Sequence, residues 1–378
     1  MKVYMGVNGL GRGHAIRSYR LANALSREGY DIYISSYGDG YGTLKNLNTT
    51  NKCCKLIKLK GYSYEWLSKQ LDWKRTILKG LLDSNKLLKH FISEINNINL
   101  INPDVVISDS RFSTCLATTL LGKSPILVTN QLSIFHTNYF FRSVIRHTFK
   151  YLWGKPKKIF IADLPPPYTI SYVNNVPVEN FFNNVEYVGL LLNLDNVNFV
   201  DYESRDIDIL FIVSAPSGDR EVFYMDTLKI ASKLSRKGYT VAIIGHGQSI
   251  GNIGSLFIAG WVENSLEYLS RSKIVVLRGG HTAILESILY GVPMLVVPAP
   301  KQTEQEGNAI SVKRLGIGSY VSYVKYYKEP FEVSRKIDGM ISNIDEYMSN
   351  IKVIRKILIN INGFERVIEY IRYSAAGE

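Results

Sequence analysis

The chain has 378 residues, a length that predicts two domains of roughly 150 to 200 residues each. Its 46% hydrophobic and 21% charged residues exclude a disordered or fibrous protein, and no stretch reaches the roughly 18 uninterrupted apolar residues of a membrane-spanning helix. The formal net charge of +12 indicates an acidic partner, and because no nucleic-acid-binding module is recognisable we expect an anionic membrane surface and no nucleic acid.

Each half of the sequence opens with a short apolar strand, a loop of small residues and a helix. In the first half, strand 2–7 leads to the loop NGLGRGH and a helical run from Ala15 to Gly29. In the second half, strand 207–213 leads to SAPSGD and a helix that stops at Gly238. Further apolar strands (VVIS, ILVT, VAIIG, IVVL and MLVVP) alternate with helical segments, which predicts two doubly wound α/β domains with parallel sheets.

These elements divide the chain into four parts. We expect a first Rossmann-like domain over residues 1–163, facing the membrane, and a second over residues 201–343. The Pro-rich and Asn-rich stretch 164–200 lacks clear periodicity and predicts a connection between them. Residues 344–378 carry apolar side chains at near-helical spacing, which predicts terminal helices.

A basic block without acidic residues lies in the first half. Residues 110–162 contain eight Lys or Arg and no Asp or Glu. Seven aromatic residues are interleaved with the later basic ones: Phe135, Tyr139, Phe140, Phe141, Phe149, Tyr151 and Trp153. This mixture is typical of a surface at lipid headgroups, where each basic residue contributes about 1 kcal/mol. A second basic amphipathic run, residues 62–91, adds Trp66 and Trp73, so we expect a cytoplasmic protein peripheral on the inner face of the cell membrane; a helix with a solvated basic face is the alternative.

The most informative loop of the second half is RGGHT, residues 278–282, between strand 273–277 and a helix that ends at Gly291. Ligands of open α/β sheets bind at the carboxyl ends of the strands. The two glycines let oxygens approach the backbone, and the helix N-terminus supplies free amide donors and about half a positive charge. The loop therefore predicts a diphosphate site, with Glu286 one turn further on to accept hydrogen bonds from ribose hydroxyls. A routine strand-to-helix turn is the alternative.

The order of these features resembles the nucleotide-sugar signature of GT-B glycosyltransferases, in particular the MurG-like enzymes of family 28, over roughly the last 170 residues. The resemblance implies two Rossmann-like domains that face each other across a cleft, a UDP-sugar as co-substrate, no further cofactor and no metal. It places Glu286 on ribose, and Gln305 and Glu306 on the hydroxyls of the donor sugar. The donor-binding residues that it implies are Gly13, Ser217, Gly218, Trp261, Val262, Arg278, Gly279, Gly280, His281, Thr282, Glu286, Gln305 and Glu306.

The first-half loop NGLGRGH does not have the glycine spacing of a dinucleotide-binding GxGxxG motif and is similar instead to the glycine-rich loop in the acceptor-binding half of these enzymes. His14 falls on the family's histidine, and neutral imidazole is suited to accept the proton of an attacking hydroxyl, which accelerates a reaction by ~10² to 10⁴. A helix-capping histidine is the alternative. Asp109, which ends the strand VVIS, either orients His14, meets the acceptor or is a turn residue. Gly11 and Arg12 are expected at the acceptor, although Arg12 departs from the family's loop.

The chain also looks like both subunits, fused, of the eukaryotic enzyme that adds the second GlcNAc to dolichyl-diphosphate-linked GlcNAc, and its composition suits an archaeon. This resemblance implies an inverting, metal-independent transfer from UDP-GlcNAc to a lipid-linked GlcNAc, forming a β-1,4 linkage in N-glycan precursor assembly. Three alternatives remain open: another lipid or small-molecule acceptor, a UDP-GlcNAc 2-epimerase of the same fold, and a non-catalytic scaffold that binds sugar nucleotides.

Overall fold

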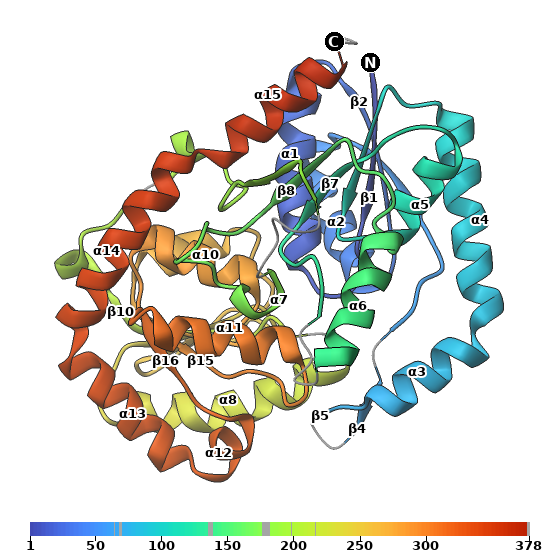
Figure 1. Ribbon diagram of the computed structural model, residues 1–378. Coiled ribbons are helices and arrows are strands. Elements are labelled where there is room, and N and C mark those ends of the chain that lie inside the picture. The colour runs from blue at the N-terminus through green and yellow to red at the C-terminus, as the bar shows by residue number, and fades with distance from the viewer. Residues whose placement is uncertain are drawn as a thin grey trace.

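The structure, a computed structural model, describes residues 1–63, 65–67, 70–134, 139–175, 182–197, 199–215 and 217–375. Within these residues the chain forms two α/β domains, each built on a seven-stranded sheet (Figure 1). Separate apolar clusters lie on the two faces of each sheet, so helices cover both faces. The doubly wound α/β class expected from the alternation of strands and helices is confirmed.

The first sheet consists of parallel strands, and its order changes direction between β1 and β6. From one edge to the other it contains β3 (Lys55–Lys58), β2 (Asp31–Ser36), β1 (Lys2–Val7), β6 (Val105–Asp109), β7 (Ile126–Thr129), β8 (Lys158–Ile161) and β9 (Val185–Tyr187). The central strands are buried along almost their whole length, as their continuous apolar runs require. Ligands bind beside such a change of direction. Asp109 ends β6, and His14 lies in the first turn of α1, directly after the loop that follows β1.

The second sheet repeats this order and has one antiparallel edge strand, β12. It contains β12 (Gly251–Ile253), β13 (Leu256–Ile258), β11 (Val241–Ile244), β10 (Ile207–Ile212), β14 (Ser272–Leu277), β15 (Met294–Val296) and β16 (Gly318–Tyr320). A separate hairpin joins β4 (Trp66–Leu67) and β5 (Gln70–Leu71). The change of direction lies between β10 and β14, so the loops after these strands meet at one place.

The helices follow the strands in alternation. Those before the second sheet are α1 (Gly13–Arg27), α2 (Gly38–Asn51), α3 (Trp73–Leu82), α4 (Ser84–Ile101), α5 (Phe112–Leu120), α6 (Tyr139–Leu152) and α7 (Tyr172–Asn175). Those after its first strand are α8 (Ser217–Arg236), α9 (Ser265–Ser270), α10 (His281–Tyr290), α11 (Thr303–Arg314), α12 (Tyr323–Lys328), α13 (Pro330–Ser342), α14 (Ile344–Ile361) and α15 (Gly363–Ala375). None of the described helices is long and apolar enough to cross a membrane.

Residues 164–200 and 344–375 are part of the two domains and are more than a connection and a terminal extension. Residues 164–200 contain β9, which pairs with β8, so the first sheet extends beyond residue 163. Helix α14 packs on the core of the second domain, whereas α15 returns to the first domain and contacts α1 and β6. A glycine is required where α15 begins, because a Cβ at Gly363 would lie 1.6 Å from the carbonyl oxygen of Val188. The two terminal helices therefore tie the domains together.

Candidate active site

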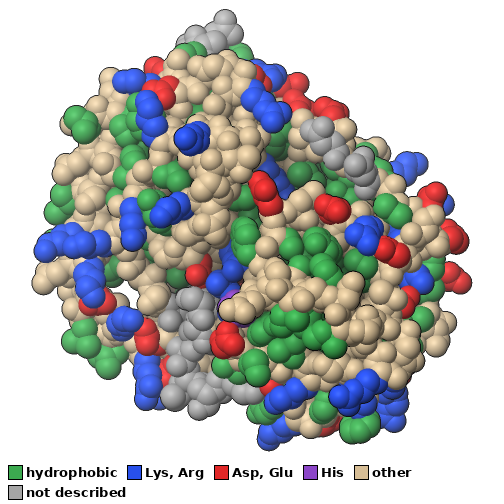
Figure 2. All heavy atoms as spheres, turned by 180° about the vertical axis from the view of Figure 1, so that it is seen from behind, with side chains coloured by type: hydrophobic (Ala, Val, Ile, Leu, Met, Phe, Trp, Pro, Cys, Tyr) green, Lys and Arg blue, Asp and Glu red, His purple; other side chains and the backbone are tan. Residues whose placement is uncertain are grey.

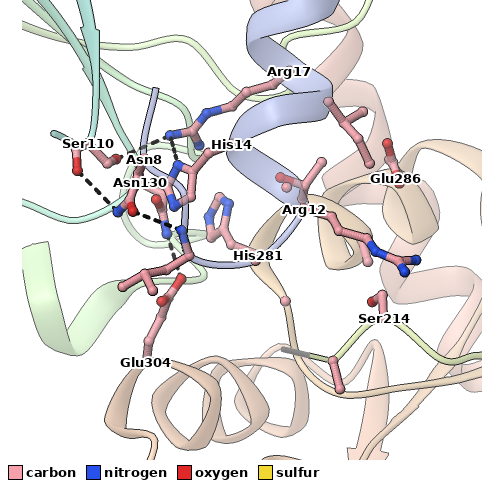
Figure 3. A pocket seen from close by; sticks show the side chains of 18 of the residues that line it. Asn8, Arg12, His14, Arg17, Ser110, Asn130, Ser214, His281, Glu286 and Glu304 are labelled. Atoms are coloured by element: carbon pink, nitrogen blue, oxygen red, sulfur yellow. Dashed lines mark hydrogen bonds between the residues drawn. The ribbon is translucent and has the colours of Figure 1, made fainter. Parts of the chain in front are cut away.

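A cavity of about 610 Å³ lies between the two domains, and both domains contribute to its lining. The first domain supplies the loop after β1 and the start of α1, and the second supplies the start of α10 and the loop after β13. Figure 2 shows a hollow between the halves where basic, acidic and histidine side chains gather. Figure 3 shows the cavity from close by, with residues of both domains pointing into it.

His14 and Asp109 are in contact on the first-domain side of the cavity. His14 lies in the first turn of α1, and its Nδ1 is 2.8 Å from Oδ1 of Asp109 at the end of β6. The carboxylate is 2% exposed, whereas the imidazole lines the cavity. When Nδ1 carries the proton it donates to Asp109, which leaves Nε2 free to accept a proton from a substrate. The pair therefore has the arrangement of a general base and the group that orients it.

Arg17 binds the same carboxylate from the next turn of α1. Its Nε donates to Asp109 Oδ2 at 2.8 Å, its terminal nitrogen donates to Oδ1, and the hydroxyl of Ser18 donates to Oδ2 at 2.7 Å. Burial opposes ionisation of Asp109, but the positive charge of Arg17 and the contact with His14 outweigh it and lower the pKa of Asp109 well below its usual range. Asp109 is therefore ionised at every pH near neutrality.

The N-termini of α1 and α10 face each other across the cavity. A Cβ placed on Gly13 would lie 3.1 Å from Oγ1 of Thr282, so a glycine lets the two helix ends approach closely. Gly280, His281 and Thr282 line the cavity at the start of α10, where the helix amides are free to bind an anion. Gly279 has φ +85°, and its carbonyl accepts a hydrogen bond from Asn308 at 3.0 Å. The hydrogen bond from Asn308, on α11, thus fixes the conformation of the strand-to-helix turn.

Two further contacts cross between the domains. Arg20 on α1 donates to Oε1 of Glu286 on α10 at 2.8 Å, and both residues line the cavity. Arg12 donates to the carbonyl of Gly245 at 2.9 Å, and its guanidinium lies 4.7 Å from the ring centroid of Trp261. Burial and the nearby Arg220 lower the pKa of Arg12 to about 10, so this cation persists at neutral pH. Arg12, which we expected at the acceptor, therefore contacts Gly245 and Trp261 of the second domain.

The structure does not bring every expected donor residue to the cavity. Trp261, Val262 and Gln305 line it, and so does Gly11 from the first domain. Among the described lining residues, Arg278, Gly279 and Glu306 are absent. Arg278 is instead enclosed and paired with Asp219 at the start of α8, and Glu306 accepts a hydrogen bond from the backbone of Lys301. Ser217 and Gly218 begin α8, but their side chains lie outside the described residues.

Several residues of the cavity were missed by the sequence analysis. Glu304 lines the cavity and accepts a hydrogen bond from Asn130 of the first domain at 2.7 Å. The sequence analysis had named Glu306, two residues further along, instead of Glu304. Arg17 and Arg20 lie three and six residues after His14, a helical spacing that could have identified them. Asn130 carries no signal of this kind, because only the packing of the domains brings it to Glu304.

Part of the cavity lining is aromatic. Phe112, Phe149 and Trp153 contribute to it, and the ring centroids of Phe112 and Trp153 lie 4.0 Å apart. Trp153 is 2% exposed, so it belongs to the core and not to a surface at lipid headgroups. Phe135 lies outside the described residues, and so do the side chains of Trp66 and Trp73. Tyr139, Phe140, Phe141 and Tyr151 are exposed on α6.

Comparison with known proteins agrees with this architecture. A model described as "Glycosyltransferase family 28 C-terminal domain" matches residues 254–366, and one described as "Glycosyl transferase family 1" matches residues 1–171. A glycosyltransferase of Methanosarcina acetivorans, described as uncharacterized, is 29% identical over 345 residues, which cover 85% of this chain and 86% of the relative.

A second relative and a solved structure extend the likeness. The UDP-N-acetylglucosamine–N-acetylmuramyl-(pentapeptide) pyrophosphoryl-undecaprenol N-acetylglucosamine transferase of Thermosipho africanus is 27% identical over 131 residues, 34% of this chain and 37% of the relative. The Streptomyces glycosyltransferase SsfS6, complexed with thymidine diphosphate, superposes with a TM-score of 0.65 at 14% identity over 98% of this chain and 99% of that one. The chain is therefore a nucleotide-sugar glycosyltransferase of the GT-B fold, and its residues 254–366 match the C-terminal domain of family 28.

Proposed function

We propose that the chain transfers GlcNAc from UDP-GlcNAc to a lipid-linked GlcNAc, with inversion at the anomeric carbon and without a metal ion. The observation that carries the transfer chemistry is one cavity in which His14, held by Asp109, faces the N-terminus of α10. A base on one side and an anion site on the other are the two groups that displacement of a nucleotide diphosphate requires.

In this proposal the first domain activates the acceptor hydroxyl and the second domain binds the leaving diphosphate. Nε2 of His14 accepts the proton of the acceptor hydroxyl while the hydroxyl oxygen attacks the anomeric carbon from the face opposite the diphosphate. The bond between that carbon and the phosphate oxygen breaks, and its electron pair leaves with the diphosphate. The free amides at the start of α10 stabilise that charge. Glu286 binds the ribose, for which it exchanges its contact with Arg20.

Two observations support a lipid-linked acceptor. The first domain lines the cavity with Phe112, Phe149 and Trp153, side chains suited to contact the apolar part of an acceptor. The relative from Thermosipho africanus is named for transfer to a lipid diphosphate, pyrophosphoryl-undecaprenol. Other apolar acceptors would fit the same wall, so the acceptor has to be identified by assay.

The assay offers radiolabelled UDP-GlcNAc and a synthetic prenyl-diphosphate-GlcNAc to the purified protein. We expect a labelled lipid disaccharide with a β-linkage, formed equally well in the presence of EDTA. UDP-glucose and dTDP-sugars, offered in parallel, test the donor, and an acceptor without the prenyl chain tests the lipid. Conversion of UDP-GlcNAc to its 2-epimer with no lipid product would contradict the proposal and identify an epimerase.

Helix α6 supports the location that we propose, at the cytoplasmic face of a membrane. It exposes Tyr139, Phe140, Phe141 and Tyr151 and carries Arg142, Arg146 and Lys150. None of the side chains described on this helix is fully buried, although Phe149 turns towards Phe112 and Trp153 at the cavity. The four exposed rings therefore lie on the same helix as the three cations. Leu78 and Leu82 are likewise exposed on α3, on the same domain. Aromatic residues at the headgroups and cations against anionic lipid together favour reversible docking.

Reversing the charge of α6 tests this location. The triple variant Arg142→Glu, Arg146→Glu, Lys150→Glu should lose co-sedimentation with vesicles containing 30% anionic lipid, by ~10-fold or more, because each basic residue near the surface contributes about 1 kcal/mol. Binding of the wild type should weaken with salt. The matched control reverses three exposed cations of the second domain, Lys229, Arg335 and Lys352, and should sediment as the wild type does. Unchanged sedimentation of the α6 variant would reject the docking surface.

A further inference from the structure

Arg20 is a cation of the first domain whose side chain contacts the second domain inside the cavity. It lies on α1, one turn beyond Arg17, which binds Asp109 of its own domain. One of its terminal nitrogens, Nη2, donates to Oε1 of Glu286 on α10 at 2.8 Å. The two side chains are only 18% and 11% exposed, so salt and water do little to screen this pair. Activation of the acceptor by His14 does not use it.

The ion pair leaves part of the guanidinium without a partner. The second terminal nitrogen of Arg20, Nη1, is buried, and no described residue accepts a hydrogen bond from it. Because a buried donor without a partner costs free energy, an exchange of partners that engages both terminal nitrogens is favourable. The direct contact between Arg20 and Glu286 is therefore one that a ligand with suitably placed oxygens can replace.

We propose that Arg20 and Glu286 together bind the ribose of the donor, with its 2′- and 3′-hydroxyls inserted between the guanidinium and the carboxylate. This rests on the proposed function, because it assumes that Glu286 binds the ribose. A carboxylate only accepts hydrogen bonds and a guanidinium only donates them, whereas a hydroxyl does both. The two hydroxyls donate to the two oxygens of Glu286, and their own oxygens accept from Nη1 and Nη2 of Arg20. The exchange gives Nη1 the partner that it lacks in the direct pair.

The positions of the two groups suit such an insertion. Both are carried by helices, which hold side chains more precisely than loops do, and the two helices approach closely where Gly13 faces Thr282. To admit a hydroxyl, the nitrogen and oxygen that now lie 2.8 Å apart must separate to roughly 4.5 Å, the span of two hydrogen bonds that meet at one oxygen. Two long side chains cover this distance by changing rotamers, so the domains need not move apart.

The inserted diol determines which class of nucleotide the cavity accepts. A 2′-deoxyribose supplies one hydroxyl, so one nitrogen of the guanidinium and one oxygen of the carboxylate are left without partners in a poorly solvated place. A site whose polar groups are built for a hydroxyl rejects the analogue that lacks it for this reason. Arg20 is thus a specificity-determining residue, contributed by the first domain, that favours a ribonucleoside diphosphate such as UDP over a deoxyribonucleoside diphosphate.

The test compares UDP with 2′-deoxy-UDP, which differ by a single hydroxyl. Their affinities are measured by calorimetry for the wild type, Arg20→Met and Arg20→Lys. We expect the wild type to prefer UDP by ~30-fold or more, and Arg20→Met, which keeps an apolar stem but has no donor, to reduce this preference by at least ~5-fold. Arg20→Lys keeps the charge at the domain interface but not the two-nitrogen fork, so it should recover only part of the preference. Arg27→Met removes an exposed arginine from the last turn of α1 and is the matched control, with wild-type preference.

Simple competition between Arg20 and the nucleotide predicts a different result. If Arg20 only blocks Glu286, its removal frees the carboxylate, and Arg20→Met binds UDP and 2′-deoxy-UDP more tightly by the same factor. An unchanged preference in both Arg20 variants, or a wild type that binds the two nucleotides equally, overturns the role of Arg20 and leaves the proposed function standing. Binding of neither nucleotide to the wild type overturns both.

Discussion

Replacement of His14 by alanine lowers kcat for sugar transfer by ~10²- to 10⁴-fold at neutral pH, because the attacking hydroxyl loses its proton acceptor. The nucleotide site lies at α10, on the other side of the cavity, so the affinity for UDP stays within about twofold of the wild type. The two constants are measured separately, by initial rates at saturating donor and by calorimetry. A fall in kcat without a change in nucleotide affinity is what distinguishes a base from a binding residue.

The control for this variant is another histidine of the same protein. His246 follows β11, contacts Glu221 at 2.6 Å and does not belong to the described lining of the cavity. His246→Ala should therefore retain wild-type rates. If His14→Ala keeps more than about a tenth of the wild-type kcat, another group is the base.

The sequence predicted the layers of both domains well because their signals are local. The apolar runs VVIS, ILVT, VAIIG, IVVL and MLVVP coincide with β6, β7, β11, β14 and β15. Helix α10 ends where expected, because Gly291 takes the left-handed conformation (φ +66°) that stops a helix. Helix α1 begins at Gly13, two residues before the expected start, since helix boundaries carry weaker signals than helix interiors.

The packing of distant segments on each other could not be predicted from these local signals. Residues 363–375 have the apolar spacing of a helix, but nothing in that spacing shows that Phe364 and Ile368 pack on the first domain while Ile354 and Leu358, one helix earlier, pack on the second. Strand β9 has only three residues and lies in a segment without periodicity. Its assignment depends on pairing with β8, which is a tertiary contact.

The backbone of the candidate site was also easier to anticipate than the directions of its side chains. The segments that follow β1, β6 and β14 can be located directly from strand ends and glycines, and residues of all three line one cavity. Whether a side chain enters that cavity depends on χ angles and neighbours that spacing does not encode. Arg12 therefore lies across the cleft against Trp261, and Glu304 lines the cavity where Glu306 was expected.

Arg278 is the clearest case of this difference, and its removal should destabilise the second domain by about 3 to 5 kcal/mol. Its side chain and that of Asp219 are both completely buried and paired. The guanidinium also donates to the carbonyl of Val297 at 3.0 Å, and its carbon lies 4.5 Å from the ring centroid of Phe223 and 4.4 Å from that of Tyr323. Arg278→Met keeps the bulk of the chain but leaves the Asp219 carboxylate buried without its cation, which is the costly state.

The measurement is equilibrium denaturation followed through Trp261, the one tryptophan in the second half of the sequence. Arg278→Met combined with Asp219→Leu removes both charges and should recover most of the lost stability, because burying two apolar side chains carries no penalty for removing a charge from water. Arg335→Met breaks the exposed pair with Glu332 and should change stability by less than about 1 kcal/mol. Wild-type stability of Arg278→Met together with lost UDP binding would instead make Arg278 a donor ligand. Asp219 lies in the first turn of α8 and Arg278 directly precedes the turn into α10. The buried pair therefore joins the two loops that we expect to surround the diphosphate. Its loss should lower the affinity for UDP as well as the stability of the fold.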